Sequence, residues 1–238
     1  MRFWMQFSGL SFTGRASAYI ASWAAPPHKK RVMLARMSEN GFIERTATIH
    51  HRDLEMGRYC FIGDRVIILQ KKSGGKVKIG SYVNIYRDTI VETDFGGDLT
   101  IGDHASIHPR CQINAYVSSV HIGEGVMIAP NCAIYPHTHG LEYGIPIRKQ
   151  PLLSHGPVTI GDEAWLGFGV VVLGGVKIGK GAAIGAGAVV VKDIPENAIA
   201  VGNPARVVRF RTKSELTVEN DTVIRTGNPI KDPESEPS

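Results

Sequence analysis

The chain has 238 residues, a formal net charge of +5 at pH 7, 27 glycines and few aromatic residues. This modest charge favours small anionic ligands and argues against a nucleic-acid-binding protein. No run of 18 apolar residues occurs, so we expect no membrane-spanning helix. We expect a cytoplasmic protein, because the three cysteines described below fit free thiols.

Residues 1–41 form an N-terminal extension without the pattern that dominates the rest of the chain. The run GRASAYIASWAA, ahead of Pro26 and Pro27, indicates a short helix. We expect this extension to cap the open end of the structure that follows, where unpaired strand edges would invite aggregation. Contact with a substrate or a partner is the alternative role.

Residues 42–192 carry a repeat of six, clearest from Val158 to Lys192, where a large aliphatic residue recurs at every sixth position. Glycine directly follows four of these aliphatic residues, and a small or β-branched residue usually lies two positions before. A period of six fits neither a helix nor a single strand, but it fits a short strand and a turn, repeated. Because positions i−2 and i share one side of a strand, both apolar sets face one interior. Three such units would make one triangular coil of a parallel β-helix.

The repeat begins imperfectly after Gly41 and becomes regular from Ile79, with five clean coils up to Val190. One long interruption, 137–157, separates the third and fourth of these coils and contains three of the nine histidines. A loop of this length inside a tight repeat is typical of a functional site.

The cysteines are Cys60, Cys111 and Cys132, and each lies two positions before a core aliphatic residue. This is the small inward position that alanine or valine fills elsewhere. We therefore predict three buried, unpaired thiols that pack as small hydrophobic groups, and no disulfide.

After Lys192 the segment 193–211 turns away from the repeat and ends in a basic cluster. Residues 212–238 are polar and rich in proline and glutamate near their end, so we expect them to lack regular structure.

Together the repeat, the histidine loop PHTHG and the runs DEAWLG and GNPARVV resemble the hexapeptide-repeat acyltransferases. The likeness is to the branch of maltose or galactoside acetyltransferases and polysaccharide O-acetyltransferases. It covers about residues 79–209 and hardly touches the N-terminal extension. The resemblance implies an all-β fold, a left-handed parallel β-helix. It also implies a homotrimer with its sites between subunits, acetyl-CoA as acyl donor, and a sugar or glycan hydroxyl as acceptor. It implies no metal.

The resemblance places the catalytic general base at His139, with His137 as the alternative. A neutral imidazole can remove the proton of an acceptor hydroxyl as that hydroxyl attacks a thioester. Glu142 is a candidate to orient the ring. No cysteine or serine is evidently placed as a covalent nucleophile, which favours direct transfer.

The remaining site residues also follow from the resemblance. Those matched to cofactor binding are Phe168, Ala186, Val191, Lys192, Arg206 and Arg209. Candidates for substrate binding are His108, in a position where the family often has asparagine, and Trp165, which is expected to face outward. The departure at His108 leaves the acceptor open.

Two alternatives come from other functional classes. A zinc enzyme of the γ-carbonic anhydrase type shares the β-helix, but it needs two histidines five residues apart. Here His104 and His108 are four apart, and His137 and His139 are two apart. A non-catalytic β-helix acting as a scaffold is the second alternative.

Overall fold

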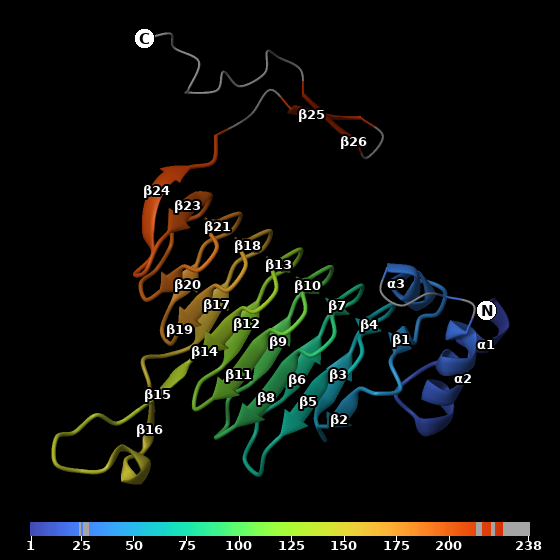
Figure 1. Cartoon of the computed structure of the whole chain (residues 1–238), viewed down its shortest axis with the longest axis horizontal. Helices are drawn as coiled ribbons and strands as arrows, with labels where there is room; N and C mark the ends of the chain where they lie inside the picture. Colours follow the sequence, from blue (N-terminus) through green and yellow to red (C-terminus); the bar gives the residue numbers. More distant parts are fainter. Residues whose placement is uncertain (24, 26–28, 213–215, 220–221, 226–238) are drawn as a thin grey trace.

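The protein is a three-sided parallel β-helix that carries helices at its N-terminal end, as a computed structural model of the chain shows (Figure 1). The structure describes residues 1–23, 25, 29–212, 216–219 and 222–225. Within them the chain runs repeatedly from a first to a second to a third sheet, and each circuit is one coil.

The strands of each sheet pair in parallel with those of the neighbouring coils. The first sheet contains β1 (Phe42–Ile43), β4 (Phe61–Ile62), β7 (Asn84–Ile85), β10 (Ser106–Ile107), β13 (Met127–Ile128), β18 (Trp165–Leu166), β21 (Ala183–Ile184) and β23 (Ala198–Val201). The second contains β2 (Thr48–His50), β5 (Ile67–Gln70), β8 (Ile90–Asp94), β11 (Gln112–Tyr116), β14 (Ala133–Tyr135), β19 (Val171–Leu173) and β22 (Val189–Val190). The third contains β3 (Leu54–Met56), β6 (Val77–Ile79), β9 (Leu99–Ile101), β12 (Val120–Ile122), β17 (Val158–Ile160) and β20 (Lys177–Ile178).

The register of the sheets explains the period of six. Each aliphatic residue of the repeat pairs with its equivalent one coil away, as Ile107 does with Ile85 and Ile128. These residues are fully buried and form one continuous core along the helix axis. The small positions two residues earlier are buried as well. Among them, Cys60, Cys111 and Cys132 are free thiols, as predicted.

The helix extends further toward both ends than the regular hexads indicate. Residues that interrupt the pattern near the N-terminus, Leu54–Met56, form β3 and pair with β6. At the other end the chain does not leave the repeat at once, because β23 pairs in parallel with β21 and Ile194 bridges to Ile178. Only then does β24 (Arg206–Phe210) pair antiparallel with β23. The hexad pattern does not reveal these outer coils, since the large aliphatic position is taken by Met56 in β3 and by Ala200 in β23.

Each coil turns its corners through residues with positive φ. We call the junction of the first and second sheets the first corner. There the left-handed residues are Arg65, Asp88, Arg110 and Asn131 in the N-terminal coils and Gly169 and Gly187 in the C-terminal ones. Positive φ favours glycine and is uncommon for other residues. The turn conformation is nevertheless the same in every one of these coils, although the residue at the turn differs.

The N-terminal helices are α1 (Arg2–Met5), α2 (Phe12–Ser22) and α3 (Lys29–Ala35). Helix α2 confirms the helix predicted before Pro26, with Ser11 accepting a hydrogen bond from Gly14 N at its N-terminus. A small core, separate from that of the coils, contains helix residues together with Phe42 and Phe61, whose side chains leave the coils on the outside. Ile49, Leu54 and Met56 of the first coil stay half-buried. The extension thus packs on one side of the first coils, and it does not cap the whole open end as we expected.

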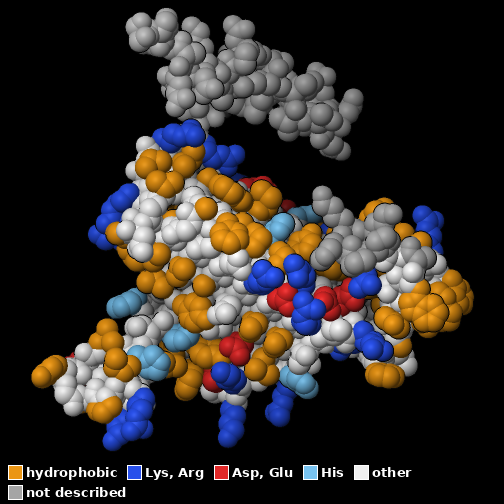
Figure 2. All heavy atoms as spheres, in the orientation of Figure 1, with side chains coloured by type: hydrophobic (Ala, Val, Ile, Leu, Met, Phe, Trp, Pro, Cys, Tyr) orange, Lys and Arg blue, Asp and Glu red, His pale blue; other side chains and the backbone are white. Residues whose placement is uncertain are grey.

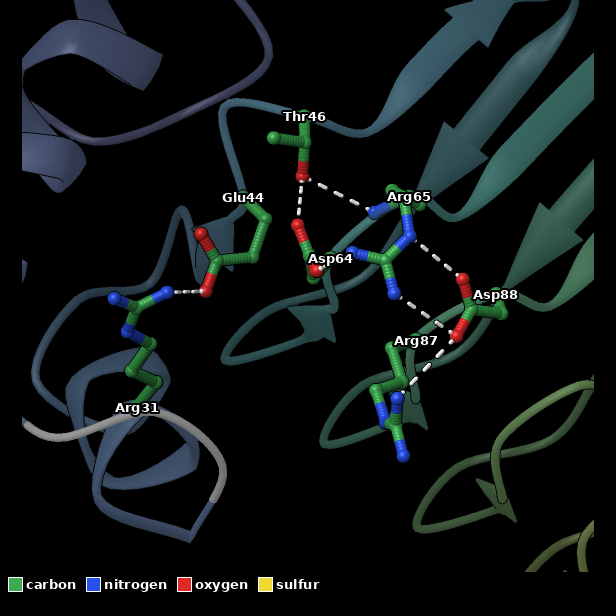
Figure 3. Close-up of polar contacts among 7 residues, drawn as sticks. All are labelled: Arg31, Glu44, Thr46, Asp64, Arg65, Arg87 and Asp88. Carbon is green, nitrogen blue, oxygen red and sulfur yellow. Dashed lines mark hydrogen bonds and ion pairs between the residues drawn. The ribbon is translucent and has the colours of Figure 1, made fainter.

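Three arginines fasten this helical extension to the coils. Arg15 donates to the carbonyl oxygens of Glu44, Arg45 and Ala47. Arg36 donates to Tyr59 O and, at 3.2 Å, to Tyr82 O. Arg31 pairs with the buried carboxylate of Glu44, beside a ladder in which Arg65 bridges Asp64 and Asp88 (Figure 3).

We expected no regular structure in residues 212–238. Two short strands occur there, β25 (Leu216–Glu219) and β26 (Thr222–Arg225), and they pair antiparallel. The other residues of 213–238 lie outside the described part. No helix among the described residues is long and apolar enough to cross a membrane.

Candidate active site

We call the junction of the second and third sheets the second corner. The histidine loop leaves the β-helix there, between β14 and β17, as a hairpin (Figure 1). Strand β15 (His137–His139) pairs antiparallel with β16 (Leu152–Ser154), so that His137 lies opposite Ser154 and His139 opposite Leu152. A 3-10 turn, Ile147–Lys149, lies within the hairpin loop. Because alternate residues of a strand share a face, the two histidine side chains project to the same side of the hairpin.

Gln150 holds the hairpin loop in shape. Its side-chain oxygen accepts a hydrogen bond from Glu142 N at 2.8 Å, and its nitrogen donates to Glu142 O at 3.1 Å and Ile145 O at 2.8 Å. Gln150 is buried, whereas residues 141–149 that precede it are exposed. Its role could not be predicted from the sequence, because one glutamine in a polar loop gives no signal. Glu142 was the candidate for orienting the His139 ring. Its backbone N–H and carbonyl bond to the Gln150 side chain.

His137 is packed between two tyrosines. Its ring stacks on Tyr116 at 5.1 Å between centroids and lies 5.6 Å from Tyr135 at a tilt. Burial, and then the proximity of His139, lowers the pKa of His137 below its ordinary value, which keeps the ring neutral near neutral pH. Its Nδ1 atom is buried without a hydrogen-bond partner among the described residues. His139, in contrast, is exposed.

A charged network supports Tyr116 from the coils below the hairpin. The Tyr116 hydroxyl lies 3.1 Å from Glu92 Oε2, and Lys71 Nζ lies over the Tyr116 ring at 4.9 Å from its centroid. Lys71 and Glu92 are 4.0 Å apart. These residues occupy outward positions of the second sheet in successive coils, so a coil-by-coil alignment of the outward positions could have found them. The hexad pattern concerns only inward positions.

The residues matched to cofactor binding fall into two groups. Phe168 and Ala186 lie at the first corner in successive coils, where Gly187 N donates to Phe168 O at 2.8 Å. Arg206 adjoins this corner, since Ala205 N donates to Val189 O at 2.8 Å. Val191 and Lys192 follow β22 at the second corner, on the side from which the hairpin departs. The second sheet separates the two groups.

The side chains at the first corner become smaller toward the C-terminal end. His108 stacks on Tyr86 at 5.0 Å, and burial lowers the pKa of its imidazole. The equivalent positions in the next coils are occupied by Ala129, Gly167 and Gly185, as the backbone hydrogen bonds from one coil to the next show. Gly167 and Gly185 allow close packing of the coils there, since a methyl group added to them would lie 2.8 Å from Ala186 N and 2.7 Å from a Val201 methyl carbon.

Trp165 faces outward from the first sheet, as predicted, with its side chain half-exposed between Met127 and Ala183. It borders a hollow of about 540 Å³ that Lys180 and Asn197 also line. This face differs from the one that carries the hairpin, so a single chain does not bring Trp165 and His139 together. Arg209 lies exposed on β24 opposite Ile199. No group of three histidine, cysteine or acidic side chains suited to a metal ion occurs among the described residues.

Comparisons with known proteins decide the family. Residues 157–192 match the family described as bacterial transferase hexapeptide (six repeats). Galactoside O-acetyltransferase of Escherichia coli is 33% identical over 143 residues, which cover 52% of this chain and 68% of that protein. The chain belongs to the hexapeptide-repeat acyltransferases. A protein of Saccharomyces cerevisiae named as an acetyltransferase is 42% identical over 127 residues, 53% of this chain and 63% of its own length. The match spans about half to two thirds of the first three curated relatives.

Two solved acyltransferase structures share the fold. A mutant of AntD, an N-acyltransferase from Bacillus cereus in complex with dTDP-4-amino-4,6-dideoxyglucose and coenzyme A, superposes with a TM-score of 0.55. It is 19% identical, and the match covers 72% of this chain and 80% of that one. The polySia specific acetyltransferase NeuO gives 0.54 at 20% identity, over 71% of this chain and 86% of that one. The likeness confirms the expected left-handed parallel β-helix.

Proposed function

We propose that this protein transfers an acetyl group from acetyl-CoA directly to a hydroxyl of a sugar or glycan precursor, with His139 as general base. The observation that carries the proposal is the histidine hairpin. It is the one long departure from the coils in the described chain, and it presents two imidazoles on one face, one packed and one exposed. Membership of the family and the likeness to galactoside O-acetyltransferase support the choice of acyl donor and acceptor class.

The chemistry assigns different tasks to the two imidazoles. A hydroxyl is a weak nucleophile at neutral pH, so a base must take its proton as the new bond to the acetyl carbon forms. The exposed His139 is accessible to an acceptor and can return that proton to the departing thiolate. His137 is enclosed by Tyr116 and Tyr135, and we assign it to positioning the hairpin.

Three basic side chains, those of Lys192, Arg206 and Arg209, would bind the phosphates of coenzyme A through charge-assisted hydrogen bonds. The exposed Phe168 and the small Ala186, in successive coils at the first corner, would contact an extended, largely apolar pantetheine arm. Since these residues occupy two corners of one chain, the proposal includes a homotrimer in which neighbouring chains complete each site.

The test is the release of free thiol from acetyl-CoA, measured with a panel of sugar acceptors for the wild-type chain and two single variants. His139→Ala should lose about 10²–10⁴-fold in turnover, the usual cost of removing a general base. The matched control His137→Ala, two residues away on the same strand, should retain most of the turnover. Circular dichroism and light scattering check that both variants fold and assemble as the wild type does.

The other outcomes are equally informative. If His137→Ala abolished turnover and His139→Ala did not, His137 would be the base. If neither substitution mattered, or if amines reacted and hydroxyls did not, the proposed O-acetylation by this mechanism would be wrong. A wild-type chain that neither released thiol nor was stabilised thermally by coenzyme A would instead fit a scaffold.

A further inference from the structure

Helix α2 has the reverse of the usual arrangement for a surface helix. Its buried side carries small residues, among them Gly14, Ala18 and Ala21. Its solvent side carries large aromatic residues at helical spacing, Phe12 and Tyr19, followed by Trp23 at its C-terminal end. Phe12 is 87% exposed and Trp23 75% exposed. Surface helices normally bury their apolar stripe, so this aromatic stripe lacks the partner it is suited to.

Helix α1 extends the same kind of surface. Ser17 Oγ of α2 donates to Trp4 O at 2.7 Å, which holds the two helices together. Phe3, which is 63% exposed, packs edge-on against Trp4 and Phe7. Figure 2 shows hydrophobic side chains gathered at this end of the molecule, over α1 and α2. We call the exposed residues of this surface the aromatic patch: Phe3, Trp4, Phe7, Leu10, Phe12, Tyr19 and Trp23.

The charge of the whole chain is concentrated in the same segment. No acidic residue precedes Glu39, and residues 1–45 contain seven lysines and arginines and two glutamates. Their formal charge is +5, which equals the net charge of the entire chain, so residues 46–238 are formally neutral. Arg2 and Arg45 are exposed, and the Arg45 guanidinium lies 4.9 Å from the centre of the Tyr19 ring in the aromatic patch.

We propose that the aromatic patch docks the protein on a membrane surface rich in anionic lipid. Phenylalanine, tyrosine and tryptophan on one side of a helix, with the exposed Arg2 and Arg45 in the same basic segment, form the composition that binds at the boundary of head groups and acyl chains. A pocket of about 440 Å³ between Leu10, Phe12 and Tyr19 opens in this surface and is mostly apolar.

A second copy of the chain is the competing occupant, and the charges disfavour it. A symmetric contact between two such patches would bring two segments of charge +5 together, whereas anionic head groups complement that charge. The inference does not rest on the proposed acetyl transfer, since none of the hairpin residues takes part in it.

The experiment is flotation of the full chain with two kinds of vesicle, phosphatidylcholine alone and phosphatidylcholine with about 30% phosphatidylglycerol. The wild type should float with the anionic vesicles, and binding should weaken as salt is raised. The double variant Phe12→Ser with Trp23→Ser should bind roughly tenfold more weakly or worse, since it removes aromatic area that the membrane would bury and leaves the core untouched. Arg2→Glu should weaken binding by about fivefold or more. Phe95→Ser, which removes an exposed aromatic residue from the turn after β8, is the matched control and should bind like the wild type.

Two results would overturn the proposal. One is a wild-type chain that does not float with anionic vesicles, or that floats equally well with neutral ones. The other is a double variant that still binds vesicles but changes its oligomeric state in light scattering, which would assign the patch to contact between copies.

Discussion

The coils and the histidine hairpin are held together by different means. In the coils, backbone hydrogen bonds run from each strand to the next coil, and equivalent aliphatic residues stack at the same inward position. In the hairpin loop, one side chain, Gln150, makes three of the hydrogen bonds that fix the chain. The coils therefore share their stability among many similar contacts, whereas the geometry of the candidate site depends on a few unlike ones.

The largest effect that tests this contrast is a cavity in the coils. Ile128 is fully buried and lies between Ile107 and Leu166 of the neighbouring coils. Ile128→Ala should lower the free energy of unfolding by about 2–5 kcal/mol, since it removes apolar contacts with the coils on both sides. Denaturant titration followed by circular dichroism measures it. A loss confined to one local step, with the rest of the coils unchanged, would contradict shared stability.

An intermediate effect is expected in the hairpin. Gln150→Ala removes all three hydrogen bonds, which should loosen the loop and reduce turnover about 10–100-fold through misplaced histidines. The unfolding midpoint should change little, because the coils keep their contacts. Lys149→Ala, at the exposed neighbouring position, is the control and should leave both quantities unchanged. A fall in the midpoint comparable to that of Ile128→Ala would show that the hairpin and the coils unfold together.

The smallest effect is on the pH dependence of stability. Burial lowers the pKa of His137 below its ordinary value of 6.5, so the unfolded chain binds more protons between those two values. The stabilising contribution is therefore complete above about pH 6.5 and is lost as the pH falls through the folded pKa. Burial lowers the pKa of His51 and His108 in the same direction. His137→Gln should flatten the decline in melting temperature between neutral and mildly acidic pH, and an unchanged slope would contradict the assignment.

The sequence predicts the inward half of this molecule well. A side chain that must fit between identical neighbours repeats at a fixed spacing, so the aliphatic residues and the buried Cys60, Cys111 and Cys132 follow from the pattern. The stack of Tyr116 on His137 does not follow, because it depends on outward residues 21 positions apart that only the coil register brings together. The roles of Gln150 and the anchoring Arg15 could not be predicted either, because each makes contacts that do not recur in other coils. The roles of His139, Arg206 and Trp165 stay predictions.

The left-handed turns at the first corner allow the surface to vary without any change in the path of the chain. In the N-terminal coils this turn position carries the arginine and aspartate of the Arg65–Asp88 ion pair. In the C-terminal coils it is Gly169 and Gly187, and a methyl group added to either would meet no atom within 4 Å. Positive φ favours glycine at these two positions, and the space around the added methyl group is free. Asparagine, which tolerates this conformation, could thus add a polar group beside Phe168 or Ala186 while the coils keep their register. The same turn conformation can accordingly carry an ion-pair ladder in the N-terminal coils and leave unoccupied space around glycine in the C-terminal coils.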